Sequence, residues 1–562
     1  MVSHSVQTIP TQRQKYRLSI GRAPVVMAVL GVITGALTAA VVIAFRLLYE
    51  SAQRGLLPGG QLGDYEGLPA WQRLLLPIAG AAVIGLYMRH IAHRDPRTGI
   101  GFVIERTAYH EALLPLRNAI HQFVTAALAI ASGHSVGREG PSVHLGATTG
   151  SQIGQRLGLP HNSLRTLVAC GTAAAIGASF NTPLAGVAFA MEVVVMEYTI
   201  AGFLPVTIAG VAATALAHLV FGAGIVFTIP ALSIQGLHEL PLVMGLGLLL
   251  GGLAAAFIRT LRHSSRWLGH WPVVPRALVG GLVVGLIGLA YPQVMGIGYD
   301  TIAATFAGEL GVALLVGLAG AKLLATAAII GLGVPGGLIG PTLVMGAAAG
   351  GAVGLLAESL IPLPLGGPAL YALLGMGAMM GATLRAPLAA LTAMLELTAN
   401  PGIIMPGMLA IAAATLSARE VFRTDSVYHL ELGERGLDPR QNPLLQAASR
   451  LGILQLVNPR CEQLPVLADT TEWVLAAPDE GALPDRACRI DTLRAHQQAD
   501  QPPFADAVAL LPIDEKASLR DAFERLRGAG DAALLVTRPA SGGAREWTGI
   551  VTRQAIHDAY LD

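Results

Sequence analysis

The residues most able to do chemistry in this chain are charged side chains set between apolar segments. The clearest group is Gly137-Arg138-Glu139-Gly140-Pro141, which follows an apolar run and opens a further helix-like stretch. Proline suits the first turn of a helix, and glycines let backbone N–H groups face a ligand. A helix N-terminus presents unpaired donors and partial positive charge. We therefore expect an anion to bind at this helix start without a full lysine or arginine charge.

Glu139 stands at this positive end, so its carboxylate could occupy the same place as a permeant anion. Protonation, or displacement by an anion, would then open the route. Weak dipolar donors also allow a bound anion to leave, which suits conduction. The alternative is that Arg138 and Glu139 form only a local ion pair at a helix start. The flanking glycines favour the functional interpretation.

Composition indicates that membrane helices must position these residues. Hydrophobic residues make up 53% of the 562 residues, charged residues only 13%, and the mean hydropathy is +0.57. Soluble domains have about 25% charged residues. Ala23 to Phe45 runs without a charge and is long enough to span a bilayer. The basic tail, residues 1–22, should stay in the cytoplasm by the positive-inside rule.

Apolar segments between residues 23 and 430 predict an all-α polytopic membrane protein. Several segments are short and are broken by Gly and Pro. Irregular backbone at membrane depth is tolerated only beside protein or a water-filled cavity, which is typical of transporters. The predicted segments are 23–45, 70–92, 112–132, 141–157, 163–180, 184–198, 203–221, 239–260, 275–296, 311–332, 337–358, 368–381, 385–398 and 402–422.

The membrane region also contains an internal repeat. Gly140-Pro141 and Pro183-Leu184-Ala185, followed by Glu192, recur in the same order as Gly340-Pro341, Pro387-Leu388-Ala389 and Glu396. The matching order over more than fifty residues makes chance a poor explanation. A duplicated membrane unit usually places its site where the two halves meet. The repeat alone leaves open whether the halves are inverted.

Three motifs together resemble the CLC family of chloride channels and transporters. They are Gly137-Arg138-Glu139-Gly140-Pro141, the segment from Gly177 to Gly186, and Gly336-Gly337-Leu338-Ile339-Gly340-Pro341. The resemblance covers roughly residues 20–430. It implies two inverted repeats of tilted, broken helices, and a homodimer with one pathway per subunit for chloride or other small anions. It also implies a multi-pass protein of the plasma (inner) membrane, embedded in the lipid bilayer with both termini cytoplasmic.

The resemblance also implies roles for single residues. Glu139 matches the gating glutamate, and the anion-binding positions are Thr98, Gly99, Ile100, Gly101, Gly137, Arg138, Gly140, Leu338, Ile339 and Tyr428. Thr98 and Gly101 replace a usual serine and a usual proline, and a threonine hydroxyl can still donate to an anion. Ile339 replaces a usual phenylalanine, but only its backbone N–H is needed. The alternatives are a helix N-cap for Thr98 and core packing for Tyr428.

A departure from the family pattern bears on the transport mode. Proton-coupled members often carry a second acid directly after the first, but here Val193 follows Glu192. A valine cannot carry a proton, so we expect passive channel-type conduction of chloride gated by Glu139. Proton–chloride exchange is the alternative, with Glu192, Glu197 or water as the relay. Glu396, the repeat partner of Glu192, suggests instead that Glu192 is structural.

Residues 431–562 are soluble in character and predict a small cytoplasmic α/β domain. An amphipathic helix at 518–523 and strands at 532–537 and 549–552 resemble a CBS module. CBS modules commonly occur in pairs in this family. The sequence pattern of a first module within 445–500 is faint, so we interpret the two modules as a degenerate pair. Ala555 stands where such modules usually place a nucleotide-binding acid, so we expect no nucleotide cofactor and a dimer-stabilising role instead.

The remaining sequence features argue against other classes of protein. The three cysteines, Cys170, Cys461 and Cys488, have no metal-ligand spacing. Basic patches with interleaved aromatics, as in nucleic-acid binders, are missing. An intramembrane enzyme using Glu139 with His134 or His144 is a remote alternative, without a nucleophile or zinc motif. We therefore expect no metal, no cofactor and no enzymatic activity.

Overall fold

The computed structural model describes residues 24–91, 97–224, 227, 232–437, 452–458, 461–463, 472–478, 482–498, 502, 504, 506–539 and 545–561. They form two compact units. The larger unit comprises residues 26–153 and 166–438, and the smaller comprises 154–165 and 439–562. The predicted basic tail, residues 1–22, lies outside the described residues.

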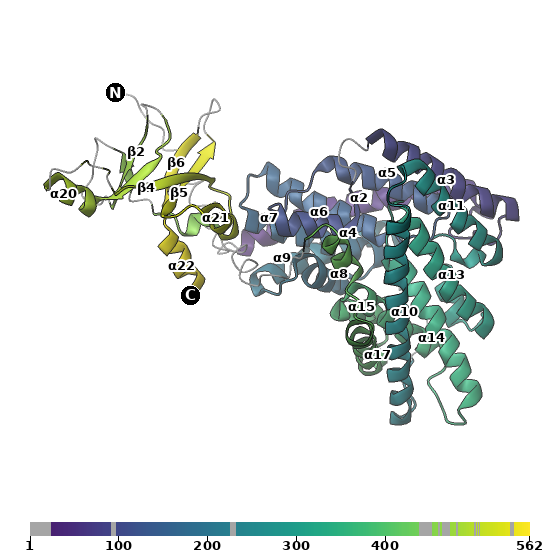
Figure 1. Ribbon diagram of the computed structural model, residues 1–562. Coiled ribbons are helices and arrows are strands. Elements are labelled where there is room, and N and C mark those ends of the chain that lie inside the picture. The colour runs from purple at the N-terminus through teal and green to yellow at the C-terminus, as the bar shows by residue number, and fades with distance from the viewer. Residues whose placement is uncertain are drawn as a thin grey trace. The chain divides into compact units, whose positions relative to one another are not determined.

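The larger unit is all-α, as predicted. Nine helices in the described part of the chain are long and apolar enough to cross a membrane. Figure 1 labels most of the helices, which are α2 (Pro24–Leu56), α3 (Ala70–Ile91), α4 (Gly99–Tyr109), α5 (Leu116–Ala131), α6 (Glu139–Arg156), α7 (His161–Phe180), α8 (Pro183–Phe189), α9 (Ile200–Phe221), α10 (Leu240–Trp267), α11 (Val273–Ala290), α12 (Tyr299–Phe306), α13 (Val312–Gly331), α14 (Ile339–Leu360), α15 (Pro368–Leu384), α16 (Pro387–Thr398), α17 (Ile404–Leu416) and α18 (Val427–Gly433).

Several elements differ from the predicted segments; α12 and α18, for example, lie outside all of them, and α2 and α4 show why. α2 continues past Phe45 to Leu56, because Arg46 is satisfied within the protein. Its guanidinium lies 2.5 Å from Glu50 and 3.8 Å from the ring centre of Phe221. α4 was not predicted at all, because charged residues interrupt its short apolar pattern. These charges are paired in the fold, since Glu105 of α4 binds Arg97 over 2.7 Å.

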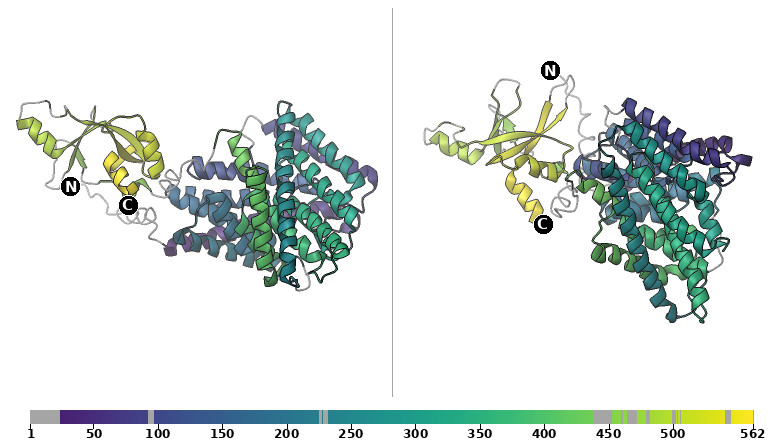
Figure 2. Two further views of the ribbon diagram at one scale, coloured as in Figure 1. Left: turned by 60° about the horizontal axis from the view of Figure 1, so that its bottom comes forward. Right: turned by 45° about the vertical axis from the view of Figure 1, so that its right-hand side comes forward.

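Small residues let the helices approach closely. A Cβ atom at Gly146 of α6 would overlap the carbonyl of Gly171 in α7, and one at Gly346 of α14 would overlap the carbonyl of Gly375 in α15. Each half of the molecule therefore uses the same glycine contact, as expected where small residues bring helix backbones together. The long helices α10, α11 and α13 lie side by side, as the teal ribbons of Figure 2 show.

The two halves of the repeat meet at equivalent residues. Gly137 and Gly337 form an isolated antiparallel bridge, with N–H···O distances of 2.7 and 2.8 Å. Antiparallel pairing of equivalent residues requires opposite chain directions, because a parallel pair would run the same way.

The smaller unit contains a six-stranded sheet. Its strands are β1 (Cys461–Gln463), β2 (Trp473–Ala476), β3 (Arg486–Arg489), β4 (Val508–Asp514), β5 (Ala532–Pro539) and β6 (Arg545–Val551), paired in that order. The β1–β2 and β4–β5 pairs are parallel and the others antiparallel. The helices are α20 (Ile490–Gln498), α21 (Leu519–Leu526) and α22 (Arg553–Leu561). The small α/β domain predicted from the sequence is therefore present.

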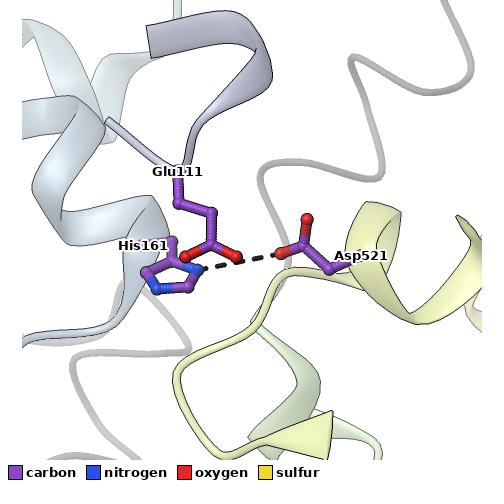
Figure 3. Close-up of side chains that lie close together, drawn as sticks. All are labelled: Glu111, His161 and Asp521. Atoms are coloured by element: carbon purple, nitrogen blue, oxygen red, sulfur yellow. Dashed lines mark ion pairs between the residues drawn. The ribbon is translucent and has the colours of Figure 1, made fainter. Parts of the chain in front are cut away.

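Local signals explain α21. The Ser518 hydroxyl accepts a hydrogen bond from the Asp521 N–H, and the Asp521 carboxylate accepts one from the Ser518 N–H, which makes a capping box. The apolar face of the helix packs through Leu519, Ala522 and Leu526 against β5. Within the same unit, His161 Nδ1 lies 3.7 Å from a carboxylate oxygen of Asp521 (Figure 3).

Candidate functional site

Two helix N-termini converge where the repeats meet. α6 begins at Glu139 and α14 at Ile339, each two residues after a glycine of the Gly137–Gly337 bridge. In this bridge the N–H and C=O groups of the two glycines bond to each other, and the helix starts that follow are therefore held beside one another. The positive ends of both helix dipoles and their unpaired N–H groups therefore lie in one region, which favours an anion.

A cavity of about 510 Å³ brings most of the predicted anion-binding positions together. Its lining includes the starts of α4, α6, α14 and α18, together with residues of α10, α11 and α13. The predicted residues among the lining are Thr98, Gly99, Ile100, Gly101, Gly140, Leu338 and Tyr428. These positions are far apart in the sequence, so the fold is what assembles them.

Two hydroxyl groups of this lining are suited to donate to an anion. Thr98 is the N-cap of α4, but its side chain makes no capping hydrogen bond, against the alternative interpretation as a simple cap. Tyr428 is 4% exposed, and its hydroxyl has no hydrogen-bond partner among the described residues. A buried hydroxyl without a partner is costly, and an anion would satisfy it.

One predicted backbone donor is already occupied. The N–H of Gly99 donates to Nδ1 of His144 over 3.2 Å, so this amide is not available to a ligand in the same geometry. From the sequence, His144 was expected only as a remote candidate partner of Glu139 in an enzyme. His144 belongs to α6, and its ring instead accepts a hydrogen bond from the first residue of α4, so it helps to cap that helix.

Glu139 lies fully buried between the two helix starts. One oxygen of its carboxylate accepts a hydrogen bond from the Tyr299 hydroxyl over 2.9 Å, and the group also contacts the backbone amide of Gly340. A Cβ atom at Gly137 would overlap this carboxylate, so the glycine leaves room for Glu139 in the position observed. The carboxylate thus lies at the start of α6, beside the start of α14.

A second, smaller hollow lies on another side of Glu139. It has a volume of about 30 Å³, and Glu139 shares its lining with Ile339 and with apolar side chains that include Phe180, Phe189 and Met380. Glu139 and Ile339 line this hollow and do not line the 510 Å³ cavity. Glu139 therefore faces the small apolar hollow, whereas the next residue, Gly140, lines the larger cavity.

Arg138 does not line either cavity, and neither does Gly137. The guanidinium of Arg138 donates to the Tyr49 hydroxyl over 3.0 Å. It also lies 4.8 Å from the ring centre of Phe180 and 5.2 Å from that of Tyr299. The side chain of Arg138 is thus used to hold Tyr299, and through it Glu139, rather than to contact the contents of the large cavity.

Glu192 has a defined partner in the opposite repeat. Its carboxylate accepts from the N–H groups of Leu388 and Ala389, over 3.3 and 2.9 Å, at the start of α16. Glu396 does the same for Leu184 and Ala185 at the start of α8, over 2.9 and 2.7 Å. Val193 is 4% exposed and apolar. Each glutamate therefore caps a helix of the other half.

The cavity also has charged residues that the sequence analysis did not predict. Four arginines and two glutamates line it, namely Arg97, Arg262, Arg276, Arg435, Glu431 and Glu434. The excess of positive charge attracts anions. Tyr299 and Tyr49 were missed as well, because no local motif marks them. The sequence did contain a signal for Glu431, because it follows the predicted Tyr428 by three residues, which places both on one face of a helix.

Comparisons with known proteins agree with this geometry. The family described as voltage gated chloride channel matches residues 80–419. A ClcB-like chloride channel protein of Ralstonia nicotianae is 34% identical over 405 residues, which cover 70% of this chain and 93% of that protein. The H⁺/Cl⁻ exchange transporter ClcA of Vibrio cholerae is 30% identical over 371 residues, which cover 64% and 78%.

A solved structure also has this fold. The crystal structure of a slow cyanobacterial Cl⁻/H⁺ antiporter superimposes with a TM-score of 0.64 at 22% identity, covering 73% of this chain and 97% of that one. The protein is therefore a member of the CLC family of chloride-transporting membrane proteins.

Proposed function

We propose that this protein moves chloride across the membrane in exchange for protons, with Glu139 as the site that both ions share. The observation that carries the proposal is the position of the Glu139 carboxylate, buried at two converging helix N-termini beside an anion-attracting cavity. A group in that place blocks the anion when ionised. It clears the place when it takes up a proton, so one group links both movements.

The passive conduction expected from the sequence is less well supported. That expectation depended on Val193, whereas relatives of this chain include named H⁺/Cl⁻ exchange transporters. Glu192 is occupied in capping α16, so it is a poor substitute for the missing acid. Exchange therefore needs a residue other than Glu192 or Val193 to carry protons from the inner solution to Glu139. A passive channel would need no such residue.

Chloride binding would use donors from three helix starts. The hydroxyls of Thr98 and Tyr428 and the backbone N–H groups of Leu338 and Ile339 are the proposed ligands. None of these is a cation, so binding stays weak enough for rapid release. The arginines of the cavity raise the local chloride concentration without forming the site itself.

The proposal extends to the assembly and its surroundings. We propose a homodimer in the plasma (inner) membrane with cytoplasmic termini, on the basis of the family and of the basic residues in 1–22. The C-terminal domain would stabilise that dimer.

Purified protein in liposomes tests the proposal. Chloride efflux down its gradient is followed with a chloride electrode while external pH is recorded. Exchange predicts proton uptake into the vesicles that stops when chloride efflux stops. Chloride efflux without any proton movement would restore the passive interpretation, and no efflux of any anion would reject both.

A further inference from the structure

We propose that Glu431 is the inner proton-transfer residue and replaces the acid that is missing at position 193. The inference rests on the proposed exchange. Glu431 lies on α18, one helical turn after Tyr428, and both residues line the 510 Å³ cavity. Its side chain is 42% exposed, so protons from the cavity can reach it, whereas Tyr428 beside it is buried.

The start of α4 is shaped to admit this carboxylate. A Cβ atom at Gly101 would overlap the carboxylate of Glu431. Gly101 is the third residue of α4, where a side chain could otherwise fill the space. The glycine therefore allows an acid to reach the first turn of a helix that also supplies Thr98 to the cavity. A carboxylate is stabilised at such an N-terminus but remains free to exchange protons with the cavity.

The charges around Glu431 leave it able to change its protonation state. Its carboxylate lies 3.1 Å from Arg435, and Arg435 also binds Glu105 over 2.8 Å. Arg435 therefore keeps a partner when Glu431 takes up a proton, so no buried charge is left uncompensated. The side chain of Glu105 is itself 4% exposed and also binds Arg97 over 2.7 Å.

The other charged groups near α18 do not offer the same site. Glu434 lines the same cavity, but Arg262 and Arg266 of α10 bind it over 3.0 and 2.9 Å. Protonating Glu434 would leave two guanidinium groups without their shared partner. Arg276, which also lines the cavity, carries a fixed positive charge. Glu431 is therefore the acid of this lining best able to bind and release protons.

Tyr428 connects Glu431 with Glu139. The charges of both carboxylates act on Tyr428, so it lies within electrostatic range of the two acids. In the proposed step, a proton from the inner solution binds a Glu431 carboxylate oxygen. It then passes through the cavity, past Tyr428, to the part of the lining formed by Gly140, and from there to the carboxylate of the neighbouring residue Glu139. Glu431 returns to its ionised form, and Glu139 becomes a neutral acid that leaves the anion's place.

The test compares two substitutions that remove the same charge from the same helix. Glu431→Gln and the control Glu434→Gln are reconstituted in liposomes, and the proton and chloride fluxes are recorded together. We expect Glu431→Gln to lower the proton flux roughly tenfold or more, as for loss of a positioned proton-transfer group, with chloride flux retained. Glu434→Gln should keep the wild-type ratio of protons to chloride.

Several outcomes would overturn the inference. Glu431→Ala serves as a second variant, should the glutamine variant fail to fold. If Glu431→Gln or Glu431→Ala folds and keeps the wild-type ratio of protons to chloride, Glu431 carries no protons, while the proposed exchange would stand. Equal loss of proton flux in Glu431→Gln and Glu434→Gln would indicate a general effect of charge. A wild-type protein that moves no protons at all would reject the exchange and this inference together.

Discussion

The hydroxyl of Tyr299 donates a hydrogen bond to the carboxylate of Glu139 over 2.9 Å, although the two residues are 160 positions apart. Tyr299 is held in turn by the guanidinium of Arg138, which lies 5.2 Å from its ring centre and binds Tyr49. This chain of contacts fixes the carboxylate in the place proposed for a permeant anion. Release of Glu139 must therefore break its bond with Tyr299.

Tyr299→Phe should speed chloride transport. The substitution keeps the ring packed against Arg138 but removes the hydrogen bond that retains Glu139. A hydrogen bond to a charged group contributes about 1.5–3 kcal/mol, so the closed position should lose roughly tenfold or more in relative population. The measurement is initial chloride efflux from liposomes at neutral pH.

Tyr291→Phe is the matched control for that variant, since Tyr291 lies earlier in the same loop region and contacts Gly317 rather than Glu139. Its efflux rate should stay near that of the wild type. An unchanged rate in Tyr299→Phe would mean that the hydrogen bond does not limit opening.

Glu139→Gln should mimic the protonated state permanently. The amide cannot ionise, so chloride efflux should lose its dependence on pH and proton movement should cease. Chloride efflux measured between about pH 4 and about pH 7.5, a range that starts near the ordinary pKa of a carboxyl group, tests this. A variant with the pH dependence of the wild type would count against Glu139 as the gate.

Glu192→Gln and Glu396→Gln should lower stability by similar amounts. Each ionised carboxylate accepts two backbone N–H groups at a helix start of the other half, and neutral amides make weaker bonds there. Loss of a cap typically costs about 0.5–2 kcal/mol. Thermal unfolding in detergent measures the change for each variant.

The same pair also tests the role of Glu192 in transport. As a structural cap, Glu192 can be replaced without altering the ratio of protons to chloride. If Glu192→Gln lost proton movement while Glu396→Gln kept it, Glu192 would be a proton carrier and its symmetric contacts would be incidental.

Asp521→Asn should loosen α21 only above acidic pH. Burial raises the pKa of Asp521, but hydrogen bonds with His161 and Ser518 outweigh it and leave the pKa below its ordinary value. The folded state therefore favours the ionised form, and this stability is lost as pH falls through the lowered pKa. Hydrogen exchange of the α21 amides should be faster in the variant at pH 7 but alike at about pH 2.5, which lies below the ordinary carboxyl range.

Asp531→Asn serves as the control, because Asp531 is exposed and lies outside the capping box. Its exchange rates in α21 should match those of the wild type at both pH values. Equal protection of α21 in Asp521→Asn and the wild type at pH 7 would refute the contribution of this carboxylate.

The sequence predicted the parts of the site that depend on local signals. Glycine and proline around Glu139 marked a helix start, and the repeat marked the position of its equivalent in the other half. Both signals are local because they reflect backbone conformations that few residues adopt. The structure places Thr98, Leu338 and Tyr428 on one cavity, as the resemblance implied.

The sequence could not predict the contacts between distant segments. Tyr299 follows an ordinary glycine-rich loop, and nothing near it indicates that it reaches Glu139. The fit between Gly101 and Glu431 also depends on how α4 and α18 pack. Such contacts arise from tertiary packing, so they carry no periodic or compositional signal.

The most direct test of the proposed exchange is the uphill movement of protons in liposomes that contain the wild-type protein. An outward chloride gradient is imposed at equal internal and external pH, and external pH is recorded as chloride leaves. The proposed exchange predicts that the external solution becomes more alkaline, and that Glu139→Gln abolishes the change. Sustained chloride efflux at constant external pH would contradict it.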